Sequence, residues 1–189
     1  GSGDAIVVTV KGRTGRLHKD SVKLETREEN GEVVIEASRE AGRKLFSFNP
    51  GEYELVVELP DRPFEQVEIV TVAADISVKQ IGANHVMMRA VHGDLETAGL
   101  SGGITARTES GDIGLHLGAI NGMIRAESFL GDIEVTIAEA PEKLSLELET
   151  RLGEQKIELP GTAIVASAPD VPMMRLASDV GDIAVRTGR

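Results

Sequence analysis

Six acidic residues recur at one position of a repeated motif, and clustered carboxylates can bind a hard cation such as calcium. They are Asp75, Asp94, Asp112, Asp132, Glu154 and Asp182. The competing interpretation is that each carboxylate accepts backbone N–H groups at its own corner, as aspartate does in turns. One carboxylate per repeat is sparse beside the dense consensus of calcium-binding repeats. The sequence therefore favours a structural role and predicts neither a metal nor a cofactor.

Histidine and serine could also carry chemistry. The four histidines, His18, His85, His92 and His116, fit no metal-ligand spacing. His92 aligns with small and apolar residues of other repeats, which predicts an interior imidazole with a hydrogen bond, whereas His116 is expected to be solvated. No serine lies in the Gly-x-Ser-x-Gly frame of a hydrolase, and the chain has no cysteine nucleophile. The sequence predicts a protein that is not an enzyme.

A third group of side chains alternates outward along the repeats and is a candidate binding face. It comprises Arg107, Glu109, Glu127, Phe129 and Arg151. Phe129 is the exposed aromatic near its centre, and Glu109 and Arg151 are expected to flank it. Ladders of surface charge are ordinary on sheets, whereas an exposed aromatic among charges is typical of a contact site. Both interpretations stay open at this point.

All these residues are positioned by a repeated Gly-Asp motif. Its clearest copy is Ser110-Gly111-Asp112-Ile113, with Gly93 18 residues before Gly111 and Gly131 20 residues after it. A period near 20 residues indicates a stacked-repeat architecture. The expected structural corners are Asp75, Gly93, Asp94, Gly111, Asp112, Gly131, Asp132, Gly153, Gly181 and Asp182.

The alternation of apolar and polar residues within one copy indicates the secondary structure of a repeat. Apolar or small residues occupy even positions from Ile104 to Ser110, and odd positions from Ile113 to Leu117. A change of parity within one strand would turn its buried face outward, so the chain must bend at Gly111, where glycine permits unusual backbone angles. Each copy is then two short strands and two corners. This predicts an all-β fold, a parallel β-helix or β-solenoid of about six two-strand coils; a β-sandwich is the alternative.

The chain divides into three expected parts. Residues 1–3 resemble a remnant of an expression tag, so that a natural leader or anchor would lie outside the sequence. Residues 4–60 contain a hairpin signal at Asn30-Gly31 and are expected to form a β-rich cap. Residues 61–189 hold the repeats, with Pro160–Pro172 as a loop outside the strand ladder. The last coil is expected to end the stack and to be the contact of a homodimer.

Composition narrows the classes of partner. The chain has 189 residues, 41% hydrophobic residues, 3% aromatic residues and a net charge of −11. The charge disfavours nucleic acid as a partner, and scarce aromatics weaken stacking on sugars or single strands. No apolar run reaches the length of a membrane span.

The Ser-Gly-Asp-Ile coils, with Leu59-Pro60 and Val67-Glu68-Ile69 before them, resemble the bacterial adhesin β-repeat family. This is a domain of unknown function, similar to LiaX-type envelope-stress proteins and to adhesin head domains. The resemblance implies a noncatalytic module of the cell envelope or the extracellular space, although a cytoplasmic location stays open. It supplies no catalytic residues. The long flat faces of a solenoid suit a protein or an envelope polymer as partner. The alternatives are a polysaccharide-acting enzyme on a β-helix and a self-assembling scaffold.

Overall fold

The computed structural model describes residues 6–13, 22–29, 32–39, 52–60, 62–100 and 102–188. The chain divides into two compact units, Gly1–Pro60 and Asp61–Arg189. The described residues form strands and no helix, so the predicted all-β class is confirmed. In the described part of the chain, no helix is long or apolar enough to cross a membrane.

The first unit contains two separate antiparallel strand pairs. β1 (Val7–Arg13) pairs with β4 (Glu52–Glu58), and β2 (Val22–Glu29) pairs with β3 (Glu32–Arg39). The hairpin predicted around Asn30-Gly31 has its two strands in β2 and β3, while the turn itself lies outside the described residues. Residues 1–3 and His18 also lie outside them.

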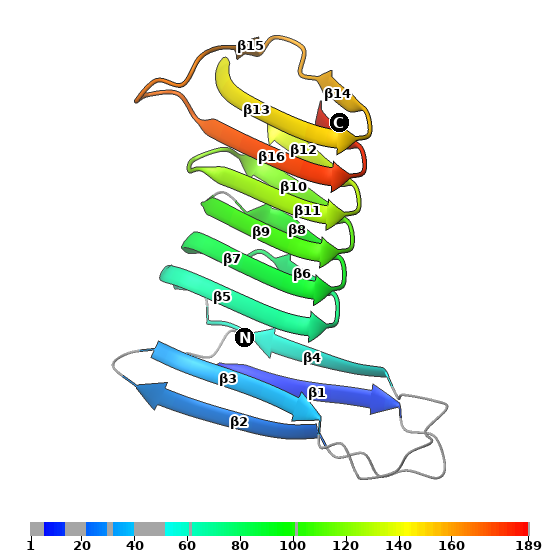
Figure 1. Cartoon of the computed structure of the whole chain (residues 1–189). Helices are drawn as coiled ribbons and strands as arrows, with labels where there is room; N and C mark the ends of the chain where they lie inside the picture. The colour runs from blue at the N-terminus through cyan, green and yellow to red at the C-terminus, as the bar shows by residue number, and fades with distance from the viewer. Residues whose placement is uncertain are drawn as a thin grey trace. The chain divides into compact units, whose positions relative to one another are not determined.

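The second unit is built from two parallel sheets. One sheet contains β5 (Phe64–Ala73), β7 (Ala83–His92), β9 (Gly103–Ser110), β11 (Ile124–Leu130), β13 (Lys143–Leu152), β15 (Ala163–Ile164) and β16 (Met173–Val180). The other contains β6 (Ile76–Lys79), β8 (Leu95–Leu100), β10 (Ile113–Ala119), β12 (Ile133–Glu139), β14 (Gln155–Glu158) and β17 (Ile183–Thr187). Figure 1 shows successive strands from β5 to β14 alternating between the two sheets, which is the coil of a β-solenoid-like fold.

The core lies between the sheets and follows the predicted parity. In β9 the side chains of Ile104 and Ala106 are buried, and in β10 those of Ile113 and Leu115 are buried. The intervening side chains Arg107 and His116 are exposed. The bend at Gly111 therefore keeps the apolar side chains of both strands inside one core.

The order of the stack differs from the order of the sequence. The seven-stranded sheet runs β15-β13-β16-β11-β9-β7-β5, so β16 lies between β11 and β13. In the other sheet β17 lies between β12 and β14 (Figure 1). The expectation that the C-terminal coil ends the stack is wrong, because this coil is inserted inside it.

The stack ends instead at β13 and β14, where part of the Pro160–Pro172 segment also joins the ladder. Ala163 and Ile164 pair in parallel with Lys143 and Leu144 of β13. The Val165 N–H donates to the Leu144 carbonyl at 3.0 Å. The expectation that Pro160–Pro172 stays outside the ladder is therefore wrong for β15, where the backbone N–H groups of Ala163 and Val165 donate to the carbonyls of Glu142 and Leu144.

Candidate functional site

Each corner glycine is required by its backbone angle and by its neighbour in the stack. Gly111 has φ 152° and Gly131 has φ 149°, angles that side-chain-bearing residues rarely adopt. A Cβ on Gly131 would lie 2.0 Å from the Gly111 carbonyl oxygen, and a Cβ on Gly111 would lie 2.2 Å from that of Gly93. The glycines therefore let successive coils approach each other closely at this corner.

The aspartates form a ladder that joins one coil to the next. The Asp112 N–H donates to Oδ1 of Asp94 at 2.8 Å, and the Asp132 N–H donates to Oδ1 of Asp112 at 2.8 Å. The same bond recurs from Asp94 to Asp75, from Asp182 to Asp132 and from Glu154 to Asp182. The expectation that each carboxylate caps its own corner is wrong. Parallel stacking places each carboxylate next to the N–H of the following coil, and the bond forms there.

A second ladder of hydroxyl groups supports the same corner. Thr108 donates to the carbonyl of Gly93 at 3.1 Å, and Ser128 donates to that of Gly111 at 3.0 Å. Ser178 and Thr150 donate in the same way to Gly131 and Gly181. The sequence signal is a serine or threonine three residues before the glycine, and our sequence analysis missed it. These partly buried bonds indicate that the corner is a structural framework.

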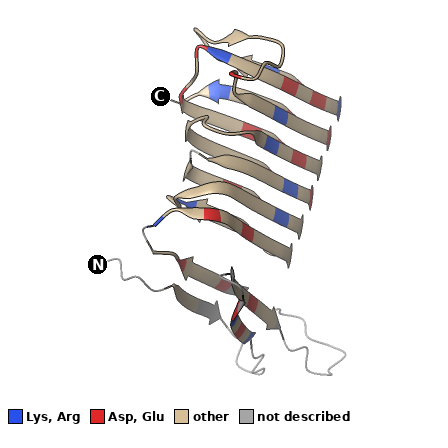
Figure 2. Cartoon of the chain, turned by 90° about the vertical axis from the view of Figure 1, so that its left-hand side faces the viewer, with Lys and Arg blue, Asp and Glu red and all other residues tan. Residues whose placement is uncertain are grey.

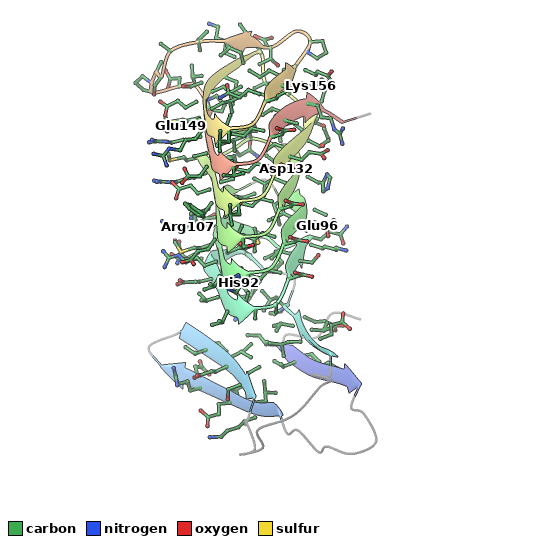
Figure 3. The ribbon with its side chains drawn as sticks, turned by 45° about the vertical axis from the view of Figure 1, so that its right-hand side comes forward. His92, Glu96, Arg107, Asp132, Glu149 and Lys156 are labelled. Atoms are coloured by element: carbon green, nitrogen blue, oxygen red, sulfur yellow. The ribbon has the colours of Figure 1, made fainter. Side chains whose placement is uncertain are left out.

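The three described histidines, His85, His92 and His116, have different surroundings. His92 is exposed, so the predicted interior imidazole is wrong. It is the last residue of β7 and lies at the corner, where the chain leaves the core (Figure 3). His116 is exposed, as its position in the alternation predicts. His85 is half-buried, and its Nε2 lies 3.2 Å from the Thr105 hydroxyl. Among the described residues, no three histidine, aspartate or glutamate side chains group as a metal site.

The outer surface of the seven-stranded sheet brings together most of the predicted binding face. Arg107 and Glu127 are register partners on β9 and β11, and the Arg107 Nη1 lies 3.5 Å from a carboxylate oxygen of Glu127. Arg125 also pairs with Glu127. Both signs of charge occur along this sheet (Figure 2). Because these pairs are partly solvated, they add little to folding stability but present a defined charge pattern.

Phe129 lies on this surface with 56% of its area exposed. The register places Glu109 of β9 beside it on one side and Asp179 of β16 on the other. Arg151 was expected as its second neighbour, which is wrong because the inserted β16 separates β11 from β13. Arg151 instead pairs with Asp179, with Nη1 3.6 Å from the carboxylate. Phe129 is thus flanked by two carboxylates.

A shallow depression lies beside Phe129. It is lined by Arg107, Thr108, Glu109, Glu127, Ser128, Phe129, Ala177 and Asp179. Ala177 occupies the register position between Glu127 and Glu149, and its small side chain leaves space there. The arrangement offers an aromatic ring, carboxylates and a guanidinium on one open surface. Such a surface can bind a partner through stacking and charge.

Comparison with known proteins agrees with this solenoid. The family model described as Toastrack, DUF4097, matches residues 64–186, which span the coils from β5 to β17. No curated protein and no solved structure matches the chain. The matched region includes the corner ladders and the surface around Phe129. The chain therefore belongs to the Toastrack family, a domain family of unknown function.

Proposed function

We propose that this protein is a noncatalytic interaction module of the bacterial cell envelope, with a protein or an envelope polymer as its partner. The observation that carries the proposal is the exposed ring of Phe129 beside a depression on a charged sheet surface. Exposed aromatic residues in such surroundings often dominate binding energy. Parallel solenoids offer long, rigid faces for this kind of contact.

The envelope location rests on the resemblance to adhesin-type β-repeats and to LiaX-type envelope-stress proteins. A role in envelope stress follows from the same resemblance. The noncatalytic part rests on the residues themselves, because the five aspartates of the corner each accept a backbone N–H from a neighbouring coil. Groups engaged in this way hold neighbouring coils together, which is a structural role.

The test is saturable binding of the purified, fluorescently labelled chain to an isolated bacterial envelope fraction. We expect Phe129→Ala to weaken this binding about ten-fold or more. The matched control is Val72→Ala, because Val72 is an exposed apolar residue on β5 of the same sheet. The control should bind like the wild type.

Two outcomes would contradict the proposal. Equal binding by wild type and Phe129→Ala would remove the ring from the contact. Release of soluble sugars from the envelope fraction during the incubation would favour the polysaccharide-acting enzyme instead.

A further inference from the structure

The end of the stack formed by β13 and β14 is covered only in part, by the segment that contains β15. β14 pairs only with β17 among the described strands, and β15 covers only Lys143 and Leu144 of β13. Every residue from Arg151 to Glu158 is exposed, including Ile157 at 47%, although its register partner Val185 is fully buried. Open strand edges beside exposed core residues are sites where another strand can add.

We propose that this end binds the same end of a second copy, around a two-fold axis that pairs β13 with β13 and β14 with β14 in antiparallel fashion. A two-fold contact requires a surface that is complementary to itself. The two edge strands meet this requirement in both charge and apolar character. The inference is independent of the proposed function, which concerns the outer surface around Phe129.

The outward charges of β13 select one register. An axis through Thr150 places Arg151 opposite Glu149 of the partner subunit, and symmetry repeats this pair. The same register places Leu152 opposite Leu148 of the partner subunit. An axis through Glu149 or Arg151 would instead place two like charges opposite each other, which destabilises a strand pair. Arg151 keeps 75% of its side chain exposed despite its pair with Asp179, so it can reach a second carboxylate.

β14 is self-complementary about Ile157. An axis through Ile157 brings this residue against its own symmetry mate and covers its exposed apolar surface. Lys156 then lies opposite Glu158 of the partner subunit, and symmetry repeats the pair. Within one chain the same two side chains already form an ion pair at 3.0 Å, which shows that they project from the same outer side of the strand.

One axis can serve both strands. Thr150 lies three residues before Gly153, and Ile157 lies three residues after Glu154, so both are equally distant from the corner. Both belong to inward-facing columns, because their register partners Ser178 and Val185 are buried. Figure 3 shows Glu149 and Lys156 on the two sheets of this end coil, pointing away from the core.

The end also carries a polar side chain at a position where the neighbouring coil carries a buried apolar one. Gln155 occupies the register position of the buried Ile183, and its Nε2 lies 3.4 Å from the Leu148 carbonyl. An amide in place of an isoleucine lowers the cost of exposing the end of the core to water. The expected association is therefore a reversible dimer, which dilution separates.

The first test is the molar mass of the full chain across protein concentrations, measured by sedimentation equilibrium. We expect a change from 20.1 kDa to twice this mass as concentration rises. Arg151→Glu should raise the dissociation constant about ten-fold or more, because it places a glutamate opposite Glu149 of the partner subunit and symmetry repeats this repulsive pair. The double variant Glu149→Arg/Arg151→Glu should restore dimerisation, since it exchanges the charges across the axis.

Arg89→Glu is the matched control, because Arg89 is an exposed arginine on β7 of the same sheet and should leave the dimer unchanged. Thermal unfolding of each variant at low concentration shows that it folds. A monomer at all concentrations overturns the proposal. A dimer that Arg151→Glu does not weaken, or that the charge exchange does not restore, overturns this interface.

The second test is a cross-link on the axis. The chain contains no cysteine, so Ile157→Cys supplies the only thiol and should form a disulfide with its symmetry mate under mild oxidation. His116→Cys places an exposed thiol on β10 of the same sheet and should not cross-link. Equal cross-linking by both variants would indicate random collision and would count against the axis.

Discussion

The two end coils of the corner ladder depart from the Gly-Asp motif in opposite ways. The first coil has Ala74-Asp75, which keeps the aspartate and lacks the glycine, whereas the coil at the other end has Gly153-Glu154, which keeps the glycine and lacks the aspartate. In the ladder, glycine faces the coil before it, and aspartate accepts an N–H from the coil after it. Ala74 belongs to β5–β6, which begins the ladder, and Glu154 belongs to β13–β14, which ends it.

This difference separates two roles within one motif. Glycine is needed where the preceding coil presents a carbonyl oxygen to it. At Gly93, for example, an added Cβ would lie 2.3 Å from the Ala74 carbonyl oxygen. Aspartate is needed where a following coil presents an N–H. An end coil lacks one of these neighbours in the ladder and so is released from one half of the motif. The deviations in the sequence thus mark the two ends of the stack.

The largest expected effect on stability tests which coil forms the end of the stack. Val185 and Ile157 are register partners in the same inward column, but Val185 is fully buried and Ile157 is 47% exposed. We expect Val185→Asp to lower the free energy of unfolding by more than about 4 kcal/mol, because it places a carboxylate in an apolar core. Ile157→Asp should cost less than about 1 kcal/mol at concentrations where the chain is monomeric.

Denaturant unfolding of both variants measures the difference. The reverse order of effects would place the C-terminal coil at the end of the stack, as the order of the sequence suggests. In that case Ala74 and Glu154 would no longer mark the two ends of the stack.

The next effect tests the role of glycine. Gly131→Ala should destabilise the protein by about 2 kcal/mol or more, because it combines an unfavourable φ with a Cβ 2.0 Å from the Gly111 carbonyl oxygen. Ala74→Gly, the converse change at the end coil, should cost only about 0.5–1 kcal/mol through the added freedom of the unfolded chain. Equilibrium unfolding in urea measures both. Similar losses in the two variants would show that the close approach of coils does not select the glycine.

The sequence predicts the coil well and the order of coils poorly, for physical reasons. The parity change at Gly111 follows from the need to keep one face buried, and this need is local. The position of β16 is not local, because parallel strands need only match in register and can pair without being adjacent in the sequence. The wrong neighbour for Phe129 follows directly, since Arg151 would flank it only if β13 lay next to β11.

Two signals in the sequence could have corrected this order. Glu154 breaks the ladder in a coil that is not the last in sequence, although the next copy, Gly181-Asp182, is intact. The spacing of 28 residues between Gly153 and Gly181 exceeds the 18 to 22 residues between the earlier corner glycines. The additional residues are enough for the chain to pass back over the coil of β13 and β14 before it forms β16. The His92 error has another cause: alternation was extended to the last residue of the strand, which already belongs to the corner.

The smallest effect tests the role of the aspartate. Asp112 Oδ1 accepts the Asp132 N–H at 2.8 Å, so Asp112→Ala removes a charge-assisted bond between two internal coils and should cost about 1–2 kcal/mol. Asp112→Asn keeps an oxygen acceptor and should recover most of this loss. Glu154→Ala should change the stability of the monomer by less than about 0.5 kcal/mol, because its carboxylate has no following coil in the ladder to join. The denaturant midpoints of unfolding of the three variants measure these differences. Equal losses of stability in Asp112→Ala and Glu154→Ala would mean that the carboxylate acts within its own corner. The two ends of the ladder would then no longer differ in whether they need an aspartate.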